Sequence, residues 1–332
     1  MAHSLTEIFD AFARHKVLVI GDVMIDSYLF GKVERISPEA PVPIISMTEQ
    51  DNRLGGAANV ALNIQSLGAV PILCAVVGND ERVDGFRKLL EDKNITSEGI
   101  LSDPSRITTV KTRIISGRQH LMRVDRETDK PLSLHTESSF IQHIKGLLEK
   151  HTISAIIFED YDKGVITPEV ISTIVSIANS KNIPTLVDPK KRNFLDYNDT
   201  TLFKPNFKEL TEGLKIDIKK NDTAGLFEAA KFLHKKGIKK VLITLSEYGV
   251  FISDGIDFKL IPAEIRDISD VSGAGDTVIG VASLCLASGL DVWQTAQIAN
   301  IAGGLVCEKI GVVPVDKQQL LDELVAKGIA GK

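Results

Sequence analysis

The sequence lacks features that define several classes of protein. Its 332 residues include only three cysteines, Cys74, Cys285 and Cys307. Their odd number, wide spacing and apolar surroundings argue against disulfides or a metal site and predict buried thiols in a reducing compartment. No apolar run reaches the ~20 residues of a membrane span. The N-terminus contains Glu7 and Asp10 where a signal peptide would be apolar, so we expect a cytoplasmic protein with no membrane partner.

Positive charge is also in short supply. Lys and Arg number 39 against 44 Asp and Glu, a formal net charge of −5, so no overall basic field favours nucleic acid as a partner. A phosphorylated ligand would need a local cluster of cations. Residues 21–26, after the first predicted strand, lack the pattern Gly-x-Gly-x-x-Gly. This absence counts against a nicotinamide-dependent oxidoreductase, the alternative from another class.

The chain does contain a regular alternation of apolar strands and helices. Strands are predicted at residues 17–20, 155–158, 184–187, 201–204 and 241–244, with helices at 137–150, 168–180 and 223–236. Such units build a mostly parallel sheet that helices cover on both faces. No linker or repeat interrupts the series, so residues 1–332 are expected to form a single α/β domain.

Two segments break this alternation. Residues 28–47 contain Pro38, Pro41 and Pro43 without a helical period, and residues 107–125 contain two β-rich runs about Gly117. Proline at this density fits edge strands or an excursion from the main sheet. We expect a small β-sheet over about 28–50 and 107–125 that acts as a lid or a dimer surface. Exposed strand edges favour a homodimer formed through this lid.

Polar residues and glycines surround the first strand and the helix after it. Asp22 and Asp26 lie just beyond the strand, where open α/β sheets bind ligands. Gly55 and Gly56 would let a ligand approach the backbone, and Asn59 offers a donor and an acceptor to a pair of hydroxyls. These residues are predicted to bind a sugar. Turn-forming aspartates and close helix packing are the alternatives.

Residues 270–276 (Asp-Val-Ser-Gly-Ala-Gly-Asp) precede an apolar run that extends to residue 290. The pattern predicts a turn that opens a buried helix, whose N-terminal amides can bind an anion. An aspartate at this position would repel a bound anion. The presence of Asp276 is explained if its carboxylate accepts a proton from an attacking hydroxyl. On the short pattern alone, a simple helix cap explains this aspartate equally well.

Three motifs in this order resemble those of the ribokinase/PfkB carbohydrate kinases: residues 54–59 (Leu-Gly-Gly-Ala-Ala-Asn), 206–209 (Asn-Phe-Lys-Glu) and 270–276. The resemblance implies a ribokinase-like three-layer α/β/α fold with a β lid. It also implies an ATP-dependent sugar kinase with Mg²⁺ as cofactor and K⁺ as a further candidate ion. A sugar-sensing dimer without catalysis is the rival interpretation, which the presence of Asp276 disfavours.

Residues 21–26, 35–43 and 112–125 are most similar to the bacterial heptose 7-phosphate kinases of that family. This similarity implies phosphorylation of the anomeric O1 of D-glycero-β-D-manno-heptose 7-phosphate, a step toward ADP-heptose and lipopolysaccharide. Another sugar or sugar phosphate is the alternative acceptor. Bifunctional members carry a C-terminal nucleotidyltransferase, and this chain ends at Lys332, so the resemblance implies a stand-alone kinase.

The family motifs imply roles for individual residues. Asp276 corresponds to the base, and the N–H groups of Gly273, Ala274 and Gly275 to those that bind the transferring phosphoryl group. Asn206 and Glu209 correspond to the residues that hold Mg²⁺–ATP through water, although their spacing also fits a helix capping box. Five further residues are expected to border the nucleotide: Thr244, Ser246, Glu247, Gly249 and Asn300.

A phosphorylated sugar also needs cations. Arg113, Arg118 and Arg123 lie in one β-rich segment and Arg35 in the other, and arginine suits bidentate phosphate binding. Lys190, just after a predicted strand, is expected near the transferring or acceptor phosphate. A solvated strand face is the simpler explanation for any single arginine, whereas phosphate binding better explains the group in a net-acidic protein.

Overall fold

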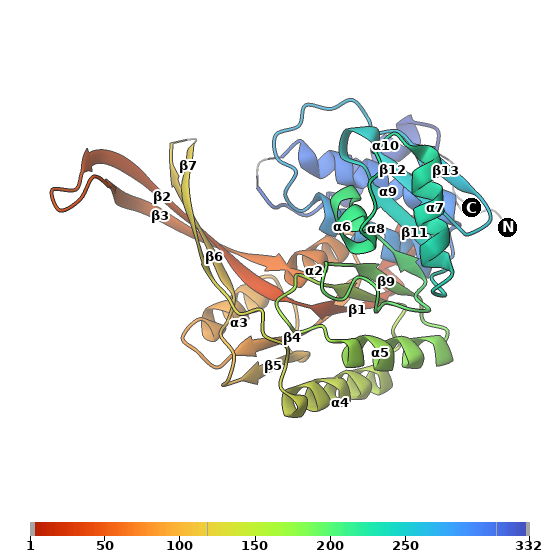
Figure 1. Cartoon of the computed structure of the whole chain (residues 1–332), viewed down its shortest axis with the longest axis horizontal. Helices are drawn as coiled ribbons and strands as arrows, with labels where there is room; N and C mark the ends of the chain where they lie inside the picture. The colour runs from red at the N-terminus through yellow and green to blue at the C-terminus, as the bar shows by residue number, and fades with distance from the viewer. Residues whose placement is uncertain (1–3, 118, 310, 330–332) are drawn as a thin grey trace.

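The computed structural model describes residues 4–117, 119–309 and 311–329. Its central sheet has nine strands in the order β13-β12-β11-β10-β9-β8-β1-β4-β5 (Figure 1). Only β12 and β13, at one edge, run antiparallel to their neighbours, so the prediction of a mostly parallel α/β sheet is confirmed. The strands are β1 (Lys16–Gly21), β4 (Val70–Gly78), β5 (Ile100–Asp103), β8 (Ala155–Glu159), β9 (Thr185–Asp188), β10 (Leu202–Phe203), β11 (Lys240–Thr244), β12 (Val250–Ser253) and β13 (Phe258–Ile261).

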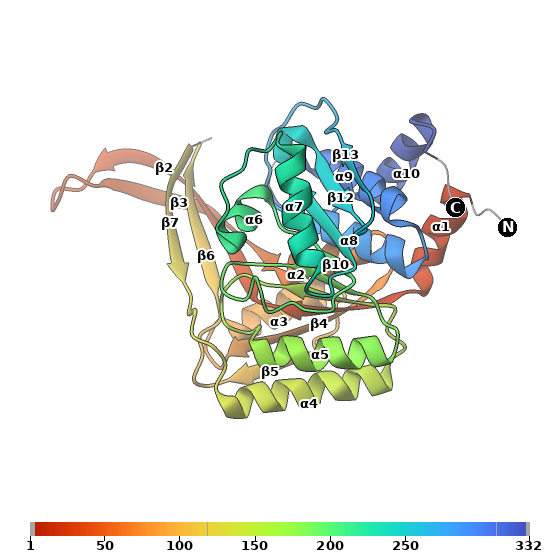
Figure 2. The same ribbon diagram turned by 45° about the vertical axis from the view of Figure 1, so that its right-hand side comes forward.

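Helices cover both faces of this sheet, as the three-layer prediction requires. One face packs against α4 (Leu134–Lys150), α5 (Pro168–Ser180), α6 (Phe207–Leu214) and α7 (Thr223–His234). The other packs against α1 (Leu5–Ala11), α2 (Ala57–Ser66), α3 (Val83–Asp92), α8 (Ala274–Ala287), α9 (Val292–Cys307) and α10 (Lys317–Ala326). Figure 2 shows α4 and α5 on the side opposite α8 and α9. Among the described helices, none is long and apolar enough to cross a bilayer. The three cysteines are free and buried, as predicted.

The order in which the chain adds strands to the sheet reverses between β1 and β8. From β1 the chain adds β4 and β5 on one side, whereas β8 to β11 extend the other side. Loops that leave adjacent strands at such a point diverge and open a crevice at the carboxyl ends of the strands. Gly21 at the end of β1 pairs with Glu159 at the end of β8. The residues after these two strands therefore lie where a ligand is expected.

A second sheet projects from the body in the order β3-β2-β6-β7 (Figure 1). It contains a long hairpin of β2 (Val23–Ile36) and β3 (Pro43–Gly56), followed by β6 (Val110–Ser116) and β7 (Gln119–Arg126). The predicted small sheet is confirmed, but its first hairpin extends beyond the expected 28–50. The inner half of β2 is buried and its outer half exposed, so no single polar pattern marks the strand. Because β2 already begins at Val23, Asp26 lies within this strand and not in a loop.

Candidate active site

The N-terminus of α8 opens into a cavity of about 1010 Å³. Gly273 precedes the helix with a φ of 83°, a left-handed conformation that favours glycine. The Ala274 N–H donates to the Val271 carbonyl at 3.3 Å. The Ala274 amide is thus already used, whereas the amides of Gly273, Gly275 and Asp276 have no acceptor four residues earlier in the helix. All four residues line this cavity, at the place where the sequence predicts an anion site.

The buried carboxylate of Asp276 binds two side chains from other elements. Its Oδ2 accepts a hydrogen bond from Asn59 Nδ2 at 2.6 Å, and its Oδ1 accepts one from the Tyr161 hydroxyl at 3.0 Å. The N-cap of α8 is Gly273, with no side-chain capping bond, so a simple helix cap does not explain Asp276. Burial raises the pKa of Asp276 to about 6, against the opposing effect of the Asn59 hydrogen bond. Above this pH the group is an anion that can accept a proton.

Tyr161→Phe is expected to move the acid limb of the pH–rate profile to higher pH. The Tyr161 hydroxyl stabilises the Asp276 anion, so its loss is expected to raise the pKa of Asp276, the predicted base, by about one unit. Activity that depends on the anion then appears only at higher pH. The measurement is kcat/KM between pH 5 and 9, which reports the free enzyme. Tyr197→Phe is the control, because its hydroxyl binds Asp160; an unmoved limb in Tyr161→Phe would contradict the assignment.

Asp22 lies beneath the site and does not face the cavity. Its buried carboxylate accepts three backbone N–H groups at 3.0 Å, from Tyr161, Lys163 and Val165. The geometry does not support the expectation that Asp22 binds sugar hydroxyls, because its side chain is buried, is not part of the cavity lining and uses three of about four acceptor positions on these amides. The aspartate instead fixes the loop after β8 that carries Tyr161.

The two glycines of the 54–59 motif are explained by close packing of β3 on β2. A β-carbon at Gly55 would lie 2.3 Å from Asp26 Oδ2. Gly56 has a φ of 62°, and a β-carbon there would lie 2.4 Å from the Asp22 carbonyl oxygen. This is the packing alternative that the sequence left open. The turn also begins α2, whose third residue, Asn59, reaches Asp276.

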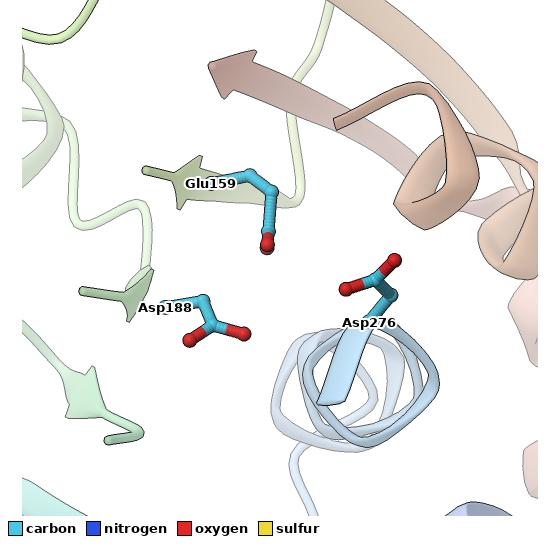
Figure 3. Close-up of side chains that lie close together, drawn as sticks. All are labelled: Glu159, Asp188 and Asp276. Carbon is cyan, nitrogen blue, oxygen red and sulfur yellow. The ribbon is translucent and has the colours of Figure 1, made fainter. Parts of the chain in front are cut away.

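Three buried carboxylates from different segments meet at the carboxyl edge of the sheet. Glu159, Asp188 and Asp276 each place a carboxylate oxygen so that these atoms lie within 4.8 Å of one another (Figure 3). Both Glu159 oxygens and Asp188 Oδ1 lack a hydrogen-bond partner among the described residues. Lys204 Nζ contacts Asp188 Oδ2 at 2.8 Å. A divalent cation fits such unpartnered carboxylate oxygens.

The cavity beside α8 contains all the residues predicted to border the nucleotide. Thr244, Ser246, Glu247, Gly249 and Asn300 line it, together with Lys190, Asn206 and Glu209. Asn206 and Glu209 form a capping box at the start of α6, the alternative that the sequence left open. Glu209 also forms an ion pair with Lys190. One oxygen of Glu209 is therefore already paired with the ammonium group of Lys190.

The predicted arginine cluster is assembled only in part: Arg113 and Arg123 lie opposite each other on β6 and β7, but Arg35 does not join them. Arg113 contacts Asp26 at 2.5 Å, whereas Arg123, paired with Arg113 across the strands, is 57% exposed and bound to Asp125. Arg35 is exposed and lies seven residues beyond Tyr28, the β2 partner of Arg113. At about 3.3 Å per strand residue it is roughly 20 Å away. Arg35 is thus removed from the group, and Arg118 lies outside the described residues.

Arg53 is a cation that the sequence analysis missed. Its guanidinium and that of Arg113 lie 4.8 and 5.2 Å from the ring centroid of Tyr28. Arg53 Nη1 would lie 2.7 Å from a β-carbon at Gly311. The next residue, Val312, would similarly contact a β-carbon at Gly273. Arg53 therefore reaches from the second sheet toward the turn that precedes α8.

Sequence reasoning also missed four residues around Asp276. They share a position at or just after a buried strand of the central sheet: Glu159, Tyr161, Asp188 and Lys204. Polar residues at that position were the signal used for Asp22. The same rule applied to the later strands would have found them.

Comparison with known proteins places this geometry in a family. The family model described as pfkB family carbohydrate kinase matches residues 14–318. "Bifunctional protein HldE" from Helicobacter hepaticus is 39% identical over 92% of this chain, and the protein of the same name from Geotalea uraniireducens is 38% identical over 96%. The alignments cover 63% and 65% of those proteins. The chain therefore spans just under two thirds of these relatives.

Solved structures support the same fold. Phosphofructokinase-2 from Escherichia coli in complex with fructose-6-phosphate has a TM-score of 0.76 at 18% identity and covers 94% of this chain and 99% of its own. Ribokinase from Arabidopsis thaliana complexed with ribose and ATP has a TM-score of 0.70 at 16% identity and covers 92% and 98%. The chain belongs to the pfkB family of carbohydrate kinases and is a sugar kinase, which transfers a phosphoryl group from ATP, with a divalent metal, to an alcohol.

Proposed function

We propose that this kinase phosphorylates the anomeric O1 of D-glycero-β-D-manno-heptose 7-phosphate, in the synthesis of ADP-heptose for lipopolysaccharide. The motifs at residues 21–26, 35–43 and 112–125 support this substrate. The structural observation that carries it is the pair of guanidinium groups, of Arg53 and Arg113, that both contact the ring of Tyr28. A kinase of free sugars does not require two arginines beside its acceptor site.

The chemistry is a direct transfer in which Asp276 is the base. Its carboxylate takes the proton of the O1 hydroxyl, O1 bonds to the γ-phosphorus, and the bond to the β–γ bridging oxygen breaks to release ADP. The N–H groups of Gly273, Gly275 and Asp276 donate to the phosphoryl oxygens as charge develops there. Asn59 and Tyr161 hold the base in position.

The cavity beside α8 holds ATP in this proposal. Thr244, Gly249 and Asn300 line it and would border the nucleotide, and Asn206 and Glu209 would hold Mg²⁺ through water. The ion supplies positive charge that offsets the charge of the phosphates. The ammonium group of Lys190, which lines the same cavity, would contact the phosphates of ATP. We also propose that K⁺ activates the enzyme. A higher reaction rate in K⁺ than in tetramethylammonium, at equal ionic strength, would support this part of the proposal.

The 7-phosphate binds between the second sheet and the turn before α8. Arg113 Nη1 donates to Asp26 and, at 3.5 Å, to the Lys111 carbonyl, and Arg53 Nε donates to Asp51. Because each guanidinium has five N–H donors, the Nε and Nη2 groups of Arg113 and both terminal NH₂ groups of Arg53 are available to phosphate oxygens. Lys111 is less suited, because it contacts both Asp125 and Glu127.

A panel of acceptors with Mg-ATP tests the proposed substrate. Heptose 7-phosphates of both anomeric forms, hexose phosphates and the free sugars are compared by ADP release and by the position of the new phosphate. The β-heptose 7-phosphate is expected to give the highest kcat/KM and a 1,7-bisphosphate product. A higher value with a free sugar would refute the substrate and leave the sugar kinase assignment standing.

A homodimer through the second sheet is the proposed assembly. A groove of about 660 Å³ between this sheet and α3 is lined in part by Leu29, Met47 and Val124. Met47 and Val124 are exposed, as is Met122, which alternates with Val124 on the same strand face. Pairing two such sheets would remove these apolar side chains from water.

Val124→Asp is expected to convert the dimer into monomers, because each interface would then bury two unpaired carboxylates. Sedimentation velocity at micromolar concentration measures the change. Arg123→Ala is the control. The Arg123 side chain points to the opposite face of the strand from Val124, so this variant should remain dimeric. A wild-type chain that sediments as a monomer would exclude this assembly.

A further inference from the structure

We propose that Asn63 is a positioning residue for phosphoryl transfer, because its buried amide joins the two helices that bring Asp276 and Asn59 together. Asn63 lies in α2, four residues and about one helical turn beyond Asn59. Its side chain is fully buried and is not among those that line the cavity, so it would act through its neighbours and not on a substrate. The inference rests on the proposed role of Asp276 as the base.

An asparagine is unexpected at this position of the helix. Asn63 is fully buried, and the residues around it in the sequence are apolar (Ala61, Leu62 and Ile64). Asparagine has a low helix propensity, and a buried amide loses the hydrogen bonds that it makes with water. Both effects cost stability unless the amide forms hydrogen bonds within the protein.

The Asn63 amide forms three such bonds. Its Nδ2 donates to the Asn59 carbonyl at 3.0 Å. Its Oδ1 accepts from Thr277 Oγ1 at 2.9 Å and from the Val315 N–H at 3.1 Å, so both of its acceptor positions are in use. A backbone carbonyl can only accept and a backbone N–H can only donate, which fixes the orientation of the amide. One side chain therefore ties α2 to the first turn of α8 and to the segment 311–315.

Two of these bonds end beside Asp276. Thr277 follows Asp276 directly in α8, and Asn59 Nδ2 donates to Asp276 Oδ2 at 2.6 Å. Asn59 Oδ1 is buried and has no hydrogen-bond partner among the described residues. The Asn59 amide is thus held by its bond to Asp276 alone, and the spacing of α2 and α8, which Asn63 bridges, decides whether that bond forms.

The third bond anchors a segment beside the turn that precedes α8. The Gly311 N–H donates to Asp270 Oδ2 at 3.0 Å, which places this segment against the turn. Asn63 binds the same segment four residues later, at Val315. Loss of the Asn63 amide would therefore loosen the contact of this segment with both helices.

Asn63→Leu tests the proposal, because leucine is similar in size and forms no side-chain hydrogen bond. A misplacement of about 1 Å can cost about 10²-fold in rate, so kcat is expected to fall about 10- to 10²-fold, with KM for ATP and for the acceptor within about threefold. The acid limb of the pH–rate profile should move to higher pH, since a weaker Asn59 bond stabilises the Asp276 anion less. Steady-state kinetics between pH 5 and 9 measure both effects.

Thr277→Val and Thr277→Ser keep the test decisive if Asn63→Leu does not fold. Valine removes the hydroxyl that donates to Asn63 and should reproduce the lower kcat and the shifted acid limb, whereas serine retains the hydroxyl and should restore both. Ser283→Ala is the matched control, because that buried hydroxyl of α8 binds the Gly280 carbonyl of its own helix. Thermal unfolding shows whether each variant folds.

A purely structural role of Asn63 would lower the melting temperature of these variants but leave kcat and the acid limb unchanged, and this result would overturn the proposal. A rise in KM alone, or a loss of kcat as large in Thr277→Ser or Ser283→Ala, would overturn it as well. Turnover of Asp276→Asn near the wild-type rate would instead refute the proposed base, so the two failures are distinguishable.

Discussion

Asp276→Asn is expected to lower kcat by at least about 10⁴-fold, the upper end of what general-base assistance contributes. Asparagine has nearly the same shape and its Oδ1 can still accept the Asn59 hydrogen bond, but it cannot take the proton of the attacking hydroxyl. ATP should bind as before, because the first-turn amides of α8 are unchanged. Steady-state kinetics and calorimetric titration with ATP measure the two properties.

Asp316→Asn is the matched control, since that aspartate caps α10 through Gln319 N–H and lies outside the cavity. It should keep the wild-type rate. Turnover of Asp276→Asn near the wild-type rate with ATP still bound would refute the role of Asp276 as base. The phosphoryl transfer would then have to proceed without a carboxylate at this place.

The double variant Arg53→Gln/Arg113→Gln is expected to lower kcat/KM for heptose 7-phosphate by about 10²- to 10⁴-fold. Each arginine is proposed to donate charge-assisted hydrogen bonds to the phosphate, worth about 1.5–3 kcal/mol apiece. Glutamine at position 113 can still donate to Asp26, which limits damage to the fold. The free heptose, a poor substrate with no phosphate, should be used at an unchanged rate.

Arg123→Gln supplies the comparison for this experiment. Arg123 pairs with Arg113 across the strands but is exposed and bound to Asp125, so its loss should leave kcat/KM for the phosphorylated sugar within about twofold of the wild type. An equal loss of activity toward the free and phosphorylated sugar in the double variant would contradict phosphate binding by Arg53 and Arg113. It would indicate that the two arginines act on the shape of the sheet.

The central sheet could be predicted from the sequence because its inner strands are covered on both faces. Such strands are continuous apolar runs, as in the fully buried residues 17–20 of β1. The hairpin of β12 and β13 was missed, since each strand has four residues and β13 is largely exposed. Short strands of this kind give little periodicity.

The site could be predicted where one short segment contains all the residues that act together, as residues 270–276 contain the glycines of the turn and Asp276. It could not be predicted where strand register decides which residues meet. Arg35 and Arg113 lie in similar β-rich segments, but β2 pairs with β6 through Tyr28 and not through Arg35. The contact of Asp276 with Asn59 joins residues 217 positions apart, a proximity that only the packing of α2 against α8 creates.

The long β2–β3 hairpin limits where this chain can tolerate a change in length. Its inner end leads from Asp22 and into α2, which contains Asn59, and Arg53 lies near this same end, paired with Asp26. A residue inserted within either strand would slip the register, and the side chains beyond it would point to the opposite face. Extra residues in the connection at 37–42 would leave the pairing unaltered. Length variation and inserted tags should therefore be accepted at this outer connection and rejected along the strands.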